Sequence, residues 1–186
     1  MNRLFPRNAR PMNSPDVLAQ GRFLSLVKEG RWEYAARTNS VGAVVIVPIT
    51  ADGELVMVRQ PRVPSGRPSI EFPAGLVGDE PDFHGEPCIA AARRELREET
   101  GYVAGRIEEL GTYPTSPGLT SEQITYVAAT DLKREGEGGG DEHEQIEVFV
   151  VPAAHLENWL TEQQAAGALI SGTTFTALWL ARHLLP

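Results

Sequence analysis

Three glutamates stand close together in one short stretch of this 186-residue chain: Glu95, Glu98 and Glu99. On an α-helix, residues four apart are separated by only about 40° around the axis, because the helix has about 3.6 residues per turn. Glu95 and Glu99 would therefore share one face, with Glu98 beside them. Carboxylate oxygens suit Mg²⁺ or Mn²⁺, and no Cys or His lies on this face to favour zinc. The spacing predicts that three carboxylates converge on one cation site.

The segment around these acids has the composition of a helix. Pro87 suits the first turn, Gly101 suits the position after the last turn, and residues 90–99 are nearly all good helix formers. The acids lie in the last turn, where the helix dipole is already negative, so each charge there costs about 0.3–1 kcal/mol. A bound cation would offset this cost. The alternative interpretation is an ordinary solvated face on which Arg94 pairs with Glu98.

The wider pattern favours the cation site. Glu86 is followed by seven residues and then by the run 94–102, RELREETGY. This arrangement resembles the signature of the Nudix family, in which a Gly, five residues, a Glu and seven further residues precede R-E-apolar-x-E-E-x-G-apolar. The chain departs from this signature at the front, where ten residues separate Gly75 from Glu86. The loop ahead of the helix is therefore expected to be enlarged by about five residues.

Residues outside the signature resemble one branch of the family, the ADP-ribose pyrophosphatases. Residues 72–76, FPAGL, are similar to the strand end and turn that precede the signature in that branch. The resemblance implies metal-dependent hydrolysis of ADP-ribose to AMP and ribose 5-phosphate, or of a related nucleoside diphosphate sugar. GDP-mannose stays open as the substrate, because the signature does not specify the base. A Nudix regulator that binds a nucleotide sugar without cleaving it is an alternative from another class.

The resemblance also implies roles for individual acids. It suggests five ligands for Mg²⁺ or Mn²⁺: the carbonyl of Ala74, Glu86, Glu95, Glu98 and Glu99. Glu95 and Glu99 would bridge the ions, and Arg94 would orient the acids and join Glu98 in the catalytic group. Family members supply a further carboxylate, which activates or positions water, from a loop ahead of a late strand. Glu144 is the first candidate for this residue and Glu142 the second.

Four residues in other segments are candidates for substrate contacts. Arg59 and Arg62 lie ahead of the FPAGL turn, and the second resembles a family arginine that binds substrate phosphate. Leu76 would pack near the ribose. Ser116 begins a loop similar to the one that covers the terminal ribose in this branch. The alternative for the two arginines is a surface position at a strand end.

An amino-terminal hairpin is the other candidate for substrate binding. Residues 32–38 resemble the hairpin through which dimeric ADP-ribose pyrophosphatases reach the active site of their partner. Trp32 would stack on the base and Arg37 would bind nearby. A homodimer is therefore expected. The alternative is that the tryptophan belongs to the hydrophobic core.

The elements that must hold these residues follow from the patterning. Segments 23–28 and 32–37 flank a turn and predict a hairpin, and strands at 41–48 and 54–60 are expected to pair across a turn at 51–53. Further strands are expected at 69–72, 106–110, 124–130 and 145–151, with helices at 153–164 and 173–185. This order predicts a mixed sheet covered on both faces. The resemblance implies the Nudix α/β/α sandwich over residues 41–186, with a tail and β-hairpin subdomain at 1–40.

Composition sets limits on partners. The formal net charge of −8 and the sequence pI near 5.0 argue against a nucleic-acid groove or an anionic membrane surface as partner. No uninterrupted apolar run approaches the roughly 20 residues that span a bilayer. The single cysteine, Cys88, has no partner for an intramolecular disulfide. A cytoplasmic enzyme acting on a small molecule is the expected class.

Overall fold

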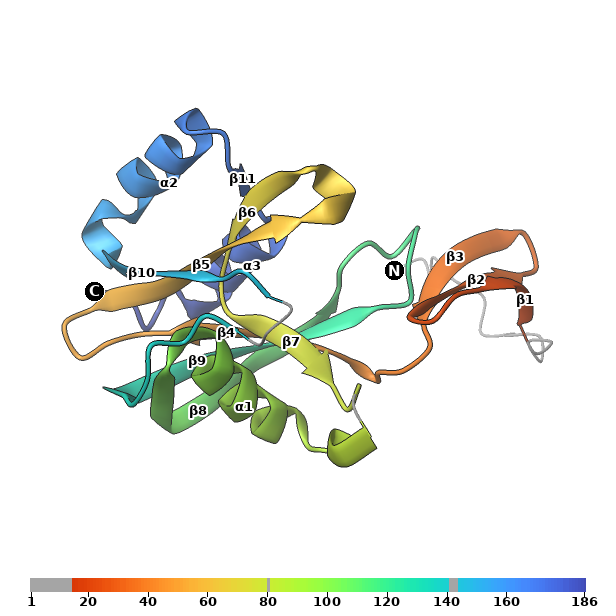
Figure 1. Cartoon of the computed structure of the whole chain (residues 1–186), viewed down its shortest axis with the longest axis horizontal. Coiled ribbons are helices and arrows are strands. Elements are labelled where there is room, and N and C mark those ends of the chain that lie inside the picture. The colour runs from red at the N-terminus through yellow and green to blue at the C-terminus, as the bar shows by residue number, and fades with distance from the viewer. Residues whose placement is uncertain (1–14, 80, 141–143) are drawn as a thin grey trace, which may run out of the picture.

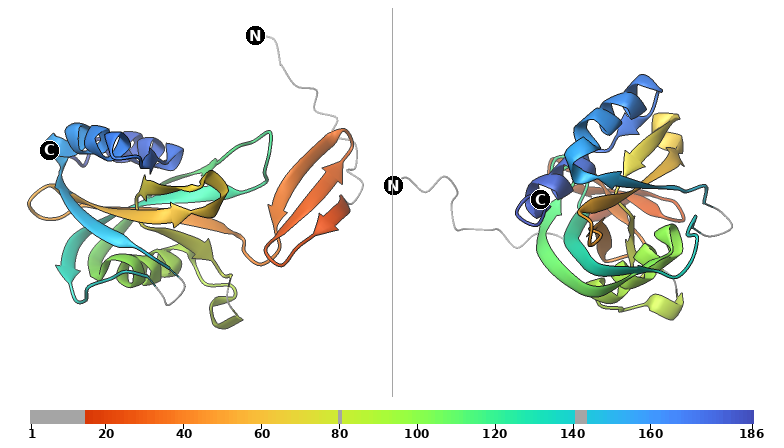
Figure 2. Two further views of the ribbon diagram at one scale, coloured as in Figure 1. Left: turned by 45° about the horizontal axis from the view of Figure 1, so that its top comes forward. Right: turned by 90° about the vertical axis from the view of Figure 1, so that its left-hand side faces the viewer.

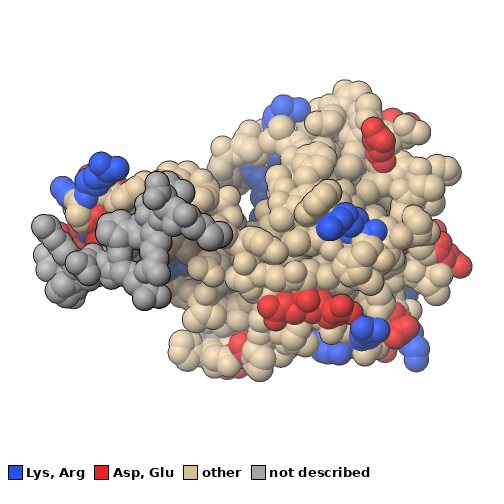
Figure 3. Space-filling model, turned by 180° about the vertical axis from the view of Figure 1, so that it is seen from behind, with Lys and Arg blue, Asp and Glu red and all other residues tan. Residues whose placement is uncertain are grey.

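The computed structural model describes residues 15–79, 81–140 and 144–186. Two four-stranded sheets share the main body of the molecule, and a third, three-stranded sheet projects from it (Figure 1). In the described part of the chain, no helix is long and apolar enough to cross a membrane. Acidic and basic side chains are dispersed over the face seen from behind (Figure 3).

The two sheets of the main body are both mixed, as the order of elements predicts. The first has the order β7-β4-β9-β8, and the second has the order β10-β5-β6-β11. Only β4 with β9 and β6 with β11 run parallel in these sheets. The strands of the first sheet are β4 (Gly42–Pro48), β7 (Ala74–Val77), β8 (Tyr102–Pro114) and β9 (Gln123–Arg134). Those of the second are β5 (Glu54–Arg62), β6 (Arg67–Glu71), β10 (Glu147–Pro152) and β11 (Leu169–Ile170).

Three helices cover these sheets. Helix α1 (Cys88–Thr100) lies on one side, and α2 (Leu156–Ala165) and α3 (Gly172–Ala181) lie on the other (Figures 1 and 2). Short 3-10 turns accompany them at η1 (Val63–Ser65), η2 (Pro81–Phe83) and η3 (Ala153–His155). This layering confirms the α/β/α sandwich.

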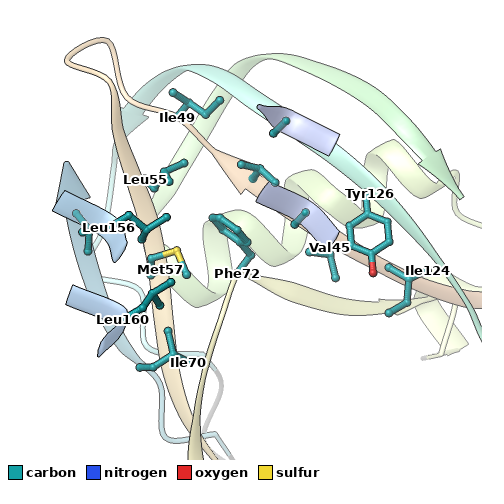
Figure 4. Close-up of a cluster of buried hydrophobic side chains, with 14 of the residues drawn as sticks. Val45, Ile49, Leu55, Met57, Ile70, Phe72, Ile124, Tyr126, Leu156 and Leu160 are labelled. Carbon is teal, nitrogen blue, oxygen red and sulfur yellow. The ribbon is translucent and has the colours of Figure 1, made fainter. Parts of the chain in front are cut away.

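Strand β4 separates two hydrophobic cores. Its side chains alternate between the faces of the sheet, and nearly all are buried because both faces are covered. Val44 and Ile46 pack in the core beneath α1, together with Leu96. Val45 packs on the opposite face in a second core that includes Phe72 (Figure 4). Helix α1 and the second sheet are thus fixed to opposite faces of one strand.

One predicted pairing is wrong. Strands β4 and β5 do not form a hairpin; they lie in different sheets, and only an isolated bridge between Ile49 and Leu55 joins them. A strand has two hydrogen-bonding edges, and both edges of β4 are occupied by β7 and β9. Both edges of β5 are likewise occupied, by β6 and β10.

The amino-terminal hairpin is confirmed and gains a third strand. Strands β2 (Leu24–Glu29) and β3 (Trp32–Arg37) pair as predicted, and β1 (Asp16–Gln20), which was not predicted, pairs with β2. This sheet extends away from the main body (Figures 1 and 2). Many of its apolar side chains are exposed: Val17, Leu18, Leu24, Leu26 and Trp32. An apolar surface of this kind is a candidate for contact with another chain.

Candidate active site

A cleft of about 560 Å³ opens beside the last turns of α1. Strand β7 and the ends of β5 and β6 supply further walls. The cleft brings together many of the residues that the sequence singles out, namely Arg37, Arg62, Ala74, Leu76, Arg94, Glu95, Glu98 and Glu144. These residues are up to 107 positions apart in the sequence, so the fold, and not local spacing, assembles the site.

Glu99 is the most deeply buried acid of the site. Glu99 is only 2% exposed. Its Oε2 accepts a hydrogen bond from the backbone N–H of Ala74 at 3.1 Å. This bond ties the last turn of α1 to the first residue of β7. Burial raises the pKa of Glu99 well above its usual value, and the charges of Glu95 and Glu144 raise it further. The site thus concentrates negative charge where water is scarce.

Glu95 lies one turn earlier, packed against the backbone of β7. A Cβ atom at residue 75 would collide with the Glu95 carboxylate, so only glycine allows this close approach. Burial raises the pKa of Glu95 to about 7, although the ion pair with Arg94 opposes the shift. Glu98 and Glu144 contribute to the rise. Gly75 is therefore the residue that admits this carboxylate to the site.

Arg94 connects three acids of the signature. Its Nη1 donates to Oε1 of Glu95 at 2.7 Å and to Oε2 of Glu98 at 3.3 Å. Its Nη2 donates to Oε1 of Glu86 at 2.9 Å and to the carbonyl oxygen of Leu76 at 3.3 Å. The surface pair with Glu98 that the alternative interpretation expects is present, but it is the longest of the three ion pairs. Arg94 therefore orients several acids at once.

The expected convergence of three carboxylates from α1 on one spot is not observed. Glu98 has a side chain that is 52% exposed, and Arg94 draws both Glu95 and Glu98 toward itself. Glu86 accepts from Arg94 and from the backbone N–H of Gly78, away from the lining of the cleft. Among the residues that the structure describes, no three acidic, histidine or cysteine side chains are arranged so that they could hold a metal ion together.

A glutamate from another part of the chain joins the acids of α1. Glu144 lines the cleft, and its charge acts on Glu95, Glu99 and Arg62. Arg62 is held across the β5–β6 pair by Glu71, with Nε to Oε1 at 2.9 Å and Nη2 to Oε2 at 2.8 Å. The second candidate, Glu142, lies outside the described residues.

The candidate substrate residues divide into two groups. Arg37, Arg62 and Leu76 line the cleft, and Arg37 forms an ion pair there with Glu122. Three other candidates do not line it. Trp32 is 54% exposed at the start of β3, Arg59 forms an ion pair with Glu147, and the carbonyl of Ser116 accepts from two N–H groups of its own turn.

Sequence reasoning missed three acids of the cleft, Glu71, Asp79 and Glu122. The sequence contains a signal for Glu71, because this acid stands between two apolar residues, Ile70 and Phe72. In the structure, Glu71 is only 8% exposed. A buried carboxylate in a strand requires a partner, which Arg62 supplies. Glu122 had no comparable signal in its polar loop.

The donor set of the cleft fits a divalent cation. Glu95, Glu99 and Glu144 repel one another electrostatically, and burial disfavours their charges. The nearby cations are already engaged, since Arg62 pairs with Glu71 and Arg94 is shared among several acids. The ligand atoms that the three glutamates offer are all oxygens, which suit Mg²⁺ or Mn²⁺. Such an ion would relieve the repulsion.

Comparisons with known proteins agree with this geometry. Residues 39–170 match the family model of the NUDIX domain. An ADP-ribose pyrophosphatase of Bacillus subtilis is 37% identical over 113 residues, which are 59% of this chain and 57% of that protein. A GDP-mannose pyrophosphatase of Pectobacterium atrosepticum is 37% identical over 119 residues, which are 60% of this chain and 58% of that protein. The matched region therefore spans less than two thirds of the length of these two relatives.

A solved structure extends the similarity to nearly the whole chain. It is described as the crystal structure of an ADP compounds hydrolase, with a TM-score of 0.71 and 26% sequence identity. The similarity covers 93% of this chain and 92% of that one. The family model, the relatives and the shared fold lead to the same assignment. The chain belongs to the Nudix family.

Proposed function

We propose that the chain is a Nudix pyrophosphohydrolase that cleaves ADP-ribose to AMP and ribose 5-phosphate. The observation that carries this proposal is the meeting of Glu95, Glu144 and Arg62 in one cleft, with the buried carboxylate of Glu99 within electrostatic reach of all three. Acids that repel one another suit a cation, and an arginine beside them suits phosphate. The similarity to an ADP-ribose pyrophosphatase supports this choice of substrate.

The cation would be held by oxygens that the cleft already contains. Glu95, Glu99 and the carbonyl of Ala74 are the proposed ligands, and Glu98 would join them by rotating its exposed side chain inward. Glu86 contributes through Arg94, to which it is bonded. When bound, Mg²⁺ or Mn²⁺ neutralises phosphate oxygens and lowers the pKa of a bound water.

The protein side chains supply the remaining chemistry. Arg62 would bind a phosphate oxygen, and Glu71 would keep its guanidinium group in place. Glu144 would accept a proton from the attacking water, because its carboxylate lies within the electrostatic reach of both Glu95 and Glu99. Arg94 would hold Glu95 at a fixed angle. Water would then attack one phosphorus atom while the bond to the bridging oxygen breaks.

The base and sugar would be bound by residues around the mouth of the cleft. Leu76 would pack against the ribose, and the loop that begins at Ser116 would cover it. This loop contacts the amino-terminal sheet, since the N–H of Ala35 donates to the carbonyl of Leu119. Arg37 would contact the base from the same side. Arg59, which pairs with Glu147 outside the cleft, would contribute only after that pair opens.

In this proposal, Trp32 contacts the substrate in the active site of a second copy of the chain. It does not line the cleft of its own chain, yet its ring is exposed on a projecting sheet with several other exposed apolar side chains. In a homodimer, the unit formed by residues 1–40 would present Trp32 to the hydrolase unit of the partner, residues 41–186. Burial of the apolar sheet would stabilise such a dimer.

GDP-mannose is the second candidate substrate. The similarity to a GDP-mannose pyrophosphatase is as high as the similarity to the ADP-ribose pyrophosphatase, at 37% identity in each case. The phosphate chemistry would be the same. The base would then be selected by contacts beside Arg37 and Trp32.

The test is product analysis by ion-exchange chromatography. The protein is incubated with Mg²⁺ and, in separate reactions, ADP-ribose, GDP-mannose and a deoxynucleoside triphosphate, each with an EDTA control. We expect AMP from ADP-ribose only when Mg²⁺ is present. Faster release of GMP from GDP-mannose would show that GDP-mannose is the preferred substrate, while the proposed mechanism of hydrolysis would stand. Absence of product in every reaction would contradict the proposed activity and favour a Nudix regulator that binds without cleaving.

A further inference from the structure

The loop that departs from the family signature folds back beside α1. Its two ends lie next to each other, since a Cβ atom on Gly78 would meet the backbone nitrogen of Gly85 at 3.4 Å. The side-chain amide of Asn39 reaches its first part by donating to the carbonyl of Asp79 at 3.5 Å. The N–H of Glu86 donates to the carbonyl of Phe83 at 2.9 Å and closes its last turn. The two ends of the enlarged loop are thus held close together ahead of α1.

Phe83 brings this loop into contact with the catalytic helix. The guanidinium carbon of Arg94 lies 4.4 Å from the centre of the Phe83 ring, which is within the range of a cation–π interaction. The other contacts of Arg94 are to the acids Glu86, Glu95 and Glu98 and to one backbone carbonyl. The guanidinium carbon thus lies over the Phe83 ring, while the guanidinium N–H groups bind the acids.

Hydrogen bonds alone leave the position of Arg94 incompletely determined. Its Nε is buried and has no hydrogen-bond partner among the described residues. Three of its acceptors are carboxylates, two of which would have to turn toward a cation. A planar ring against the guanidinium group restricts its rotation without competing for these carboxylates. Among the described residues, no other contact of Arg94 has this property.

We propose that Phe83, contributed by the enlarged loop, is a positioning residue for the cation site. It acts by stacking on Arg94, which in turn sets the orientation of Glu95 and Glu98. This inference rests on the proposed metal-dependent activity. An aromatic ring is needed at this position, because an aliphatic side chain of similar size fills the same space without attracting the guanidinium group.

The test measures Mn²⁺ binding directly, by electron paramagnetic resonance of the free ion, in wild-type protein and in Phe83→Leu and Phe83→Tyr. We expect Phe83→Leu to weaken Mn²⁺ binding by about three- to tenfold, the range that loss of a partly buried cation–π contact allows. Phe83→Tyr keeps the ring and should bind as the wild type does. Phe175→Leu, at an exposed phenylalanine on α3, is the matched control and should leave Mn²⁺ affinity unchanged.

A double-mutant cycle tests whether Phe83 acts through Arg94. Arg94→Gln removes the cation that the ring attracts, so Phe83→Leu should have little further effect in that background. Independent losses that simply add would overturn the inference, as would equal or tighter Mn²⁺ binding by Phe83→Leu. If the wild-type protein binds no Mn²⁺ and cleaves no substrate, the proposed cation site fails and this inference fails with it. Circular dichroism of each variant verifies that the fold is kept.

Discussion

The carboxylate of Glu99 lies where a negative charge is unfavourable, so a bound cation would stabilise its charged form. The helix dipole, burial and two neighbouring acids all disfavour a negative charge on Glu99 at the carboxyl end of α1. The hydrogen bond from the backbone N–H of Ala74 favours the charge, but it offsets these effects only in part. Such a group is poorly suited to a purely structural role. Its position fits the role of cation ligand that we propose for it.

Replacement of Glu99 by glutamine should separate catalysis from stability. Glu99→Gln keeps the size of the side chain and an oxygen for the Ala74 bond, but it removes the charge that would hold the cation. We expect kcat to fall by about 10²–10³-fold or more, with an equal or higher melting temperature because repulsion with Glu95 is relieved. Steady-state kinetics and thermal unfolding measure the two effects. Glu108→Gln, at an exposed glutamate, is the control, and equal kcat in both variants would contradict the assignment.

Trp32 is expected to act on binding and not on the chemical step. Stacking on the base stabilises the ground state and the transition state alike, so Trp32→Ala should raise KM by about tenfold and leave kcat nearly unchanged. Steady-state kinetics with ADP-ribose measures both constants. A fall in kcat at constant KM would show that Trp32 does not stack on the base.

Among the elements, α1 matters most, and its end depends on one glycine. Gly101 has a φ of 74°, and a Cβ atom there would collide with the carbonyl oxygen of Gly136. Gly66 has a similar φ of 64° but open space around it. Gly101→Ala should therefore cost about 2 kcal/mol or more of unfolding free energy, and Gly66→Ala about 1 kcal/mol. Urea denaturation measures both, and equal costs would show that the contact with Gly136 is unimportant.

The sequence predicts the elements of this fold better than their partners. Local apolar patterns locate β4, β5 and α1 nearly to their ends, because burial on one or two faces leaves a period in the sequence. The strands with which β4 and β5 pair could not be inferred, since these pairings depend on which distant strands occupy the edges of each. The same limit applies to the site. The signature identifies Glu95 and Glu99, but it carries no information about how Arg94 turns Glu95 or about the contact with Phe83.

The whole molecule has an exposed apolar sheet at its amino-terminal end, which the proposed dimer would bury. Leu26 on β2 is 42% exposed. Leu26→Asp should shift the protein from dimer to monomer and reduce activity on ADP-ribose, because the partner would no longer present Trp32. Val63→Asp, on the β5–β6 turn, is the matched control for an added charge. Sedimentation equilibrium measures the mass, and a wild-type monomer would contradict the proposed dimer.

The most direct test of the proposed activity is hydrolysis of ADP-ribose in ¹⁸O-labelled water with Mg²⁺, followed by mass spectrometry of the products. Attack of water on phosphorus predicts equal amounts of AMP and ribose 5-phosphate, with the label in the phosphate of only one of them. EDTA should abolish both products. Formation of ADP and labelled free ribose would show cleavage at the sugar carbon, and absence of any labelled product would contradict hydrolysis at this site.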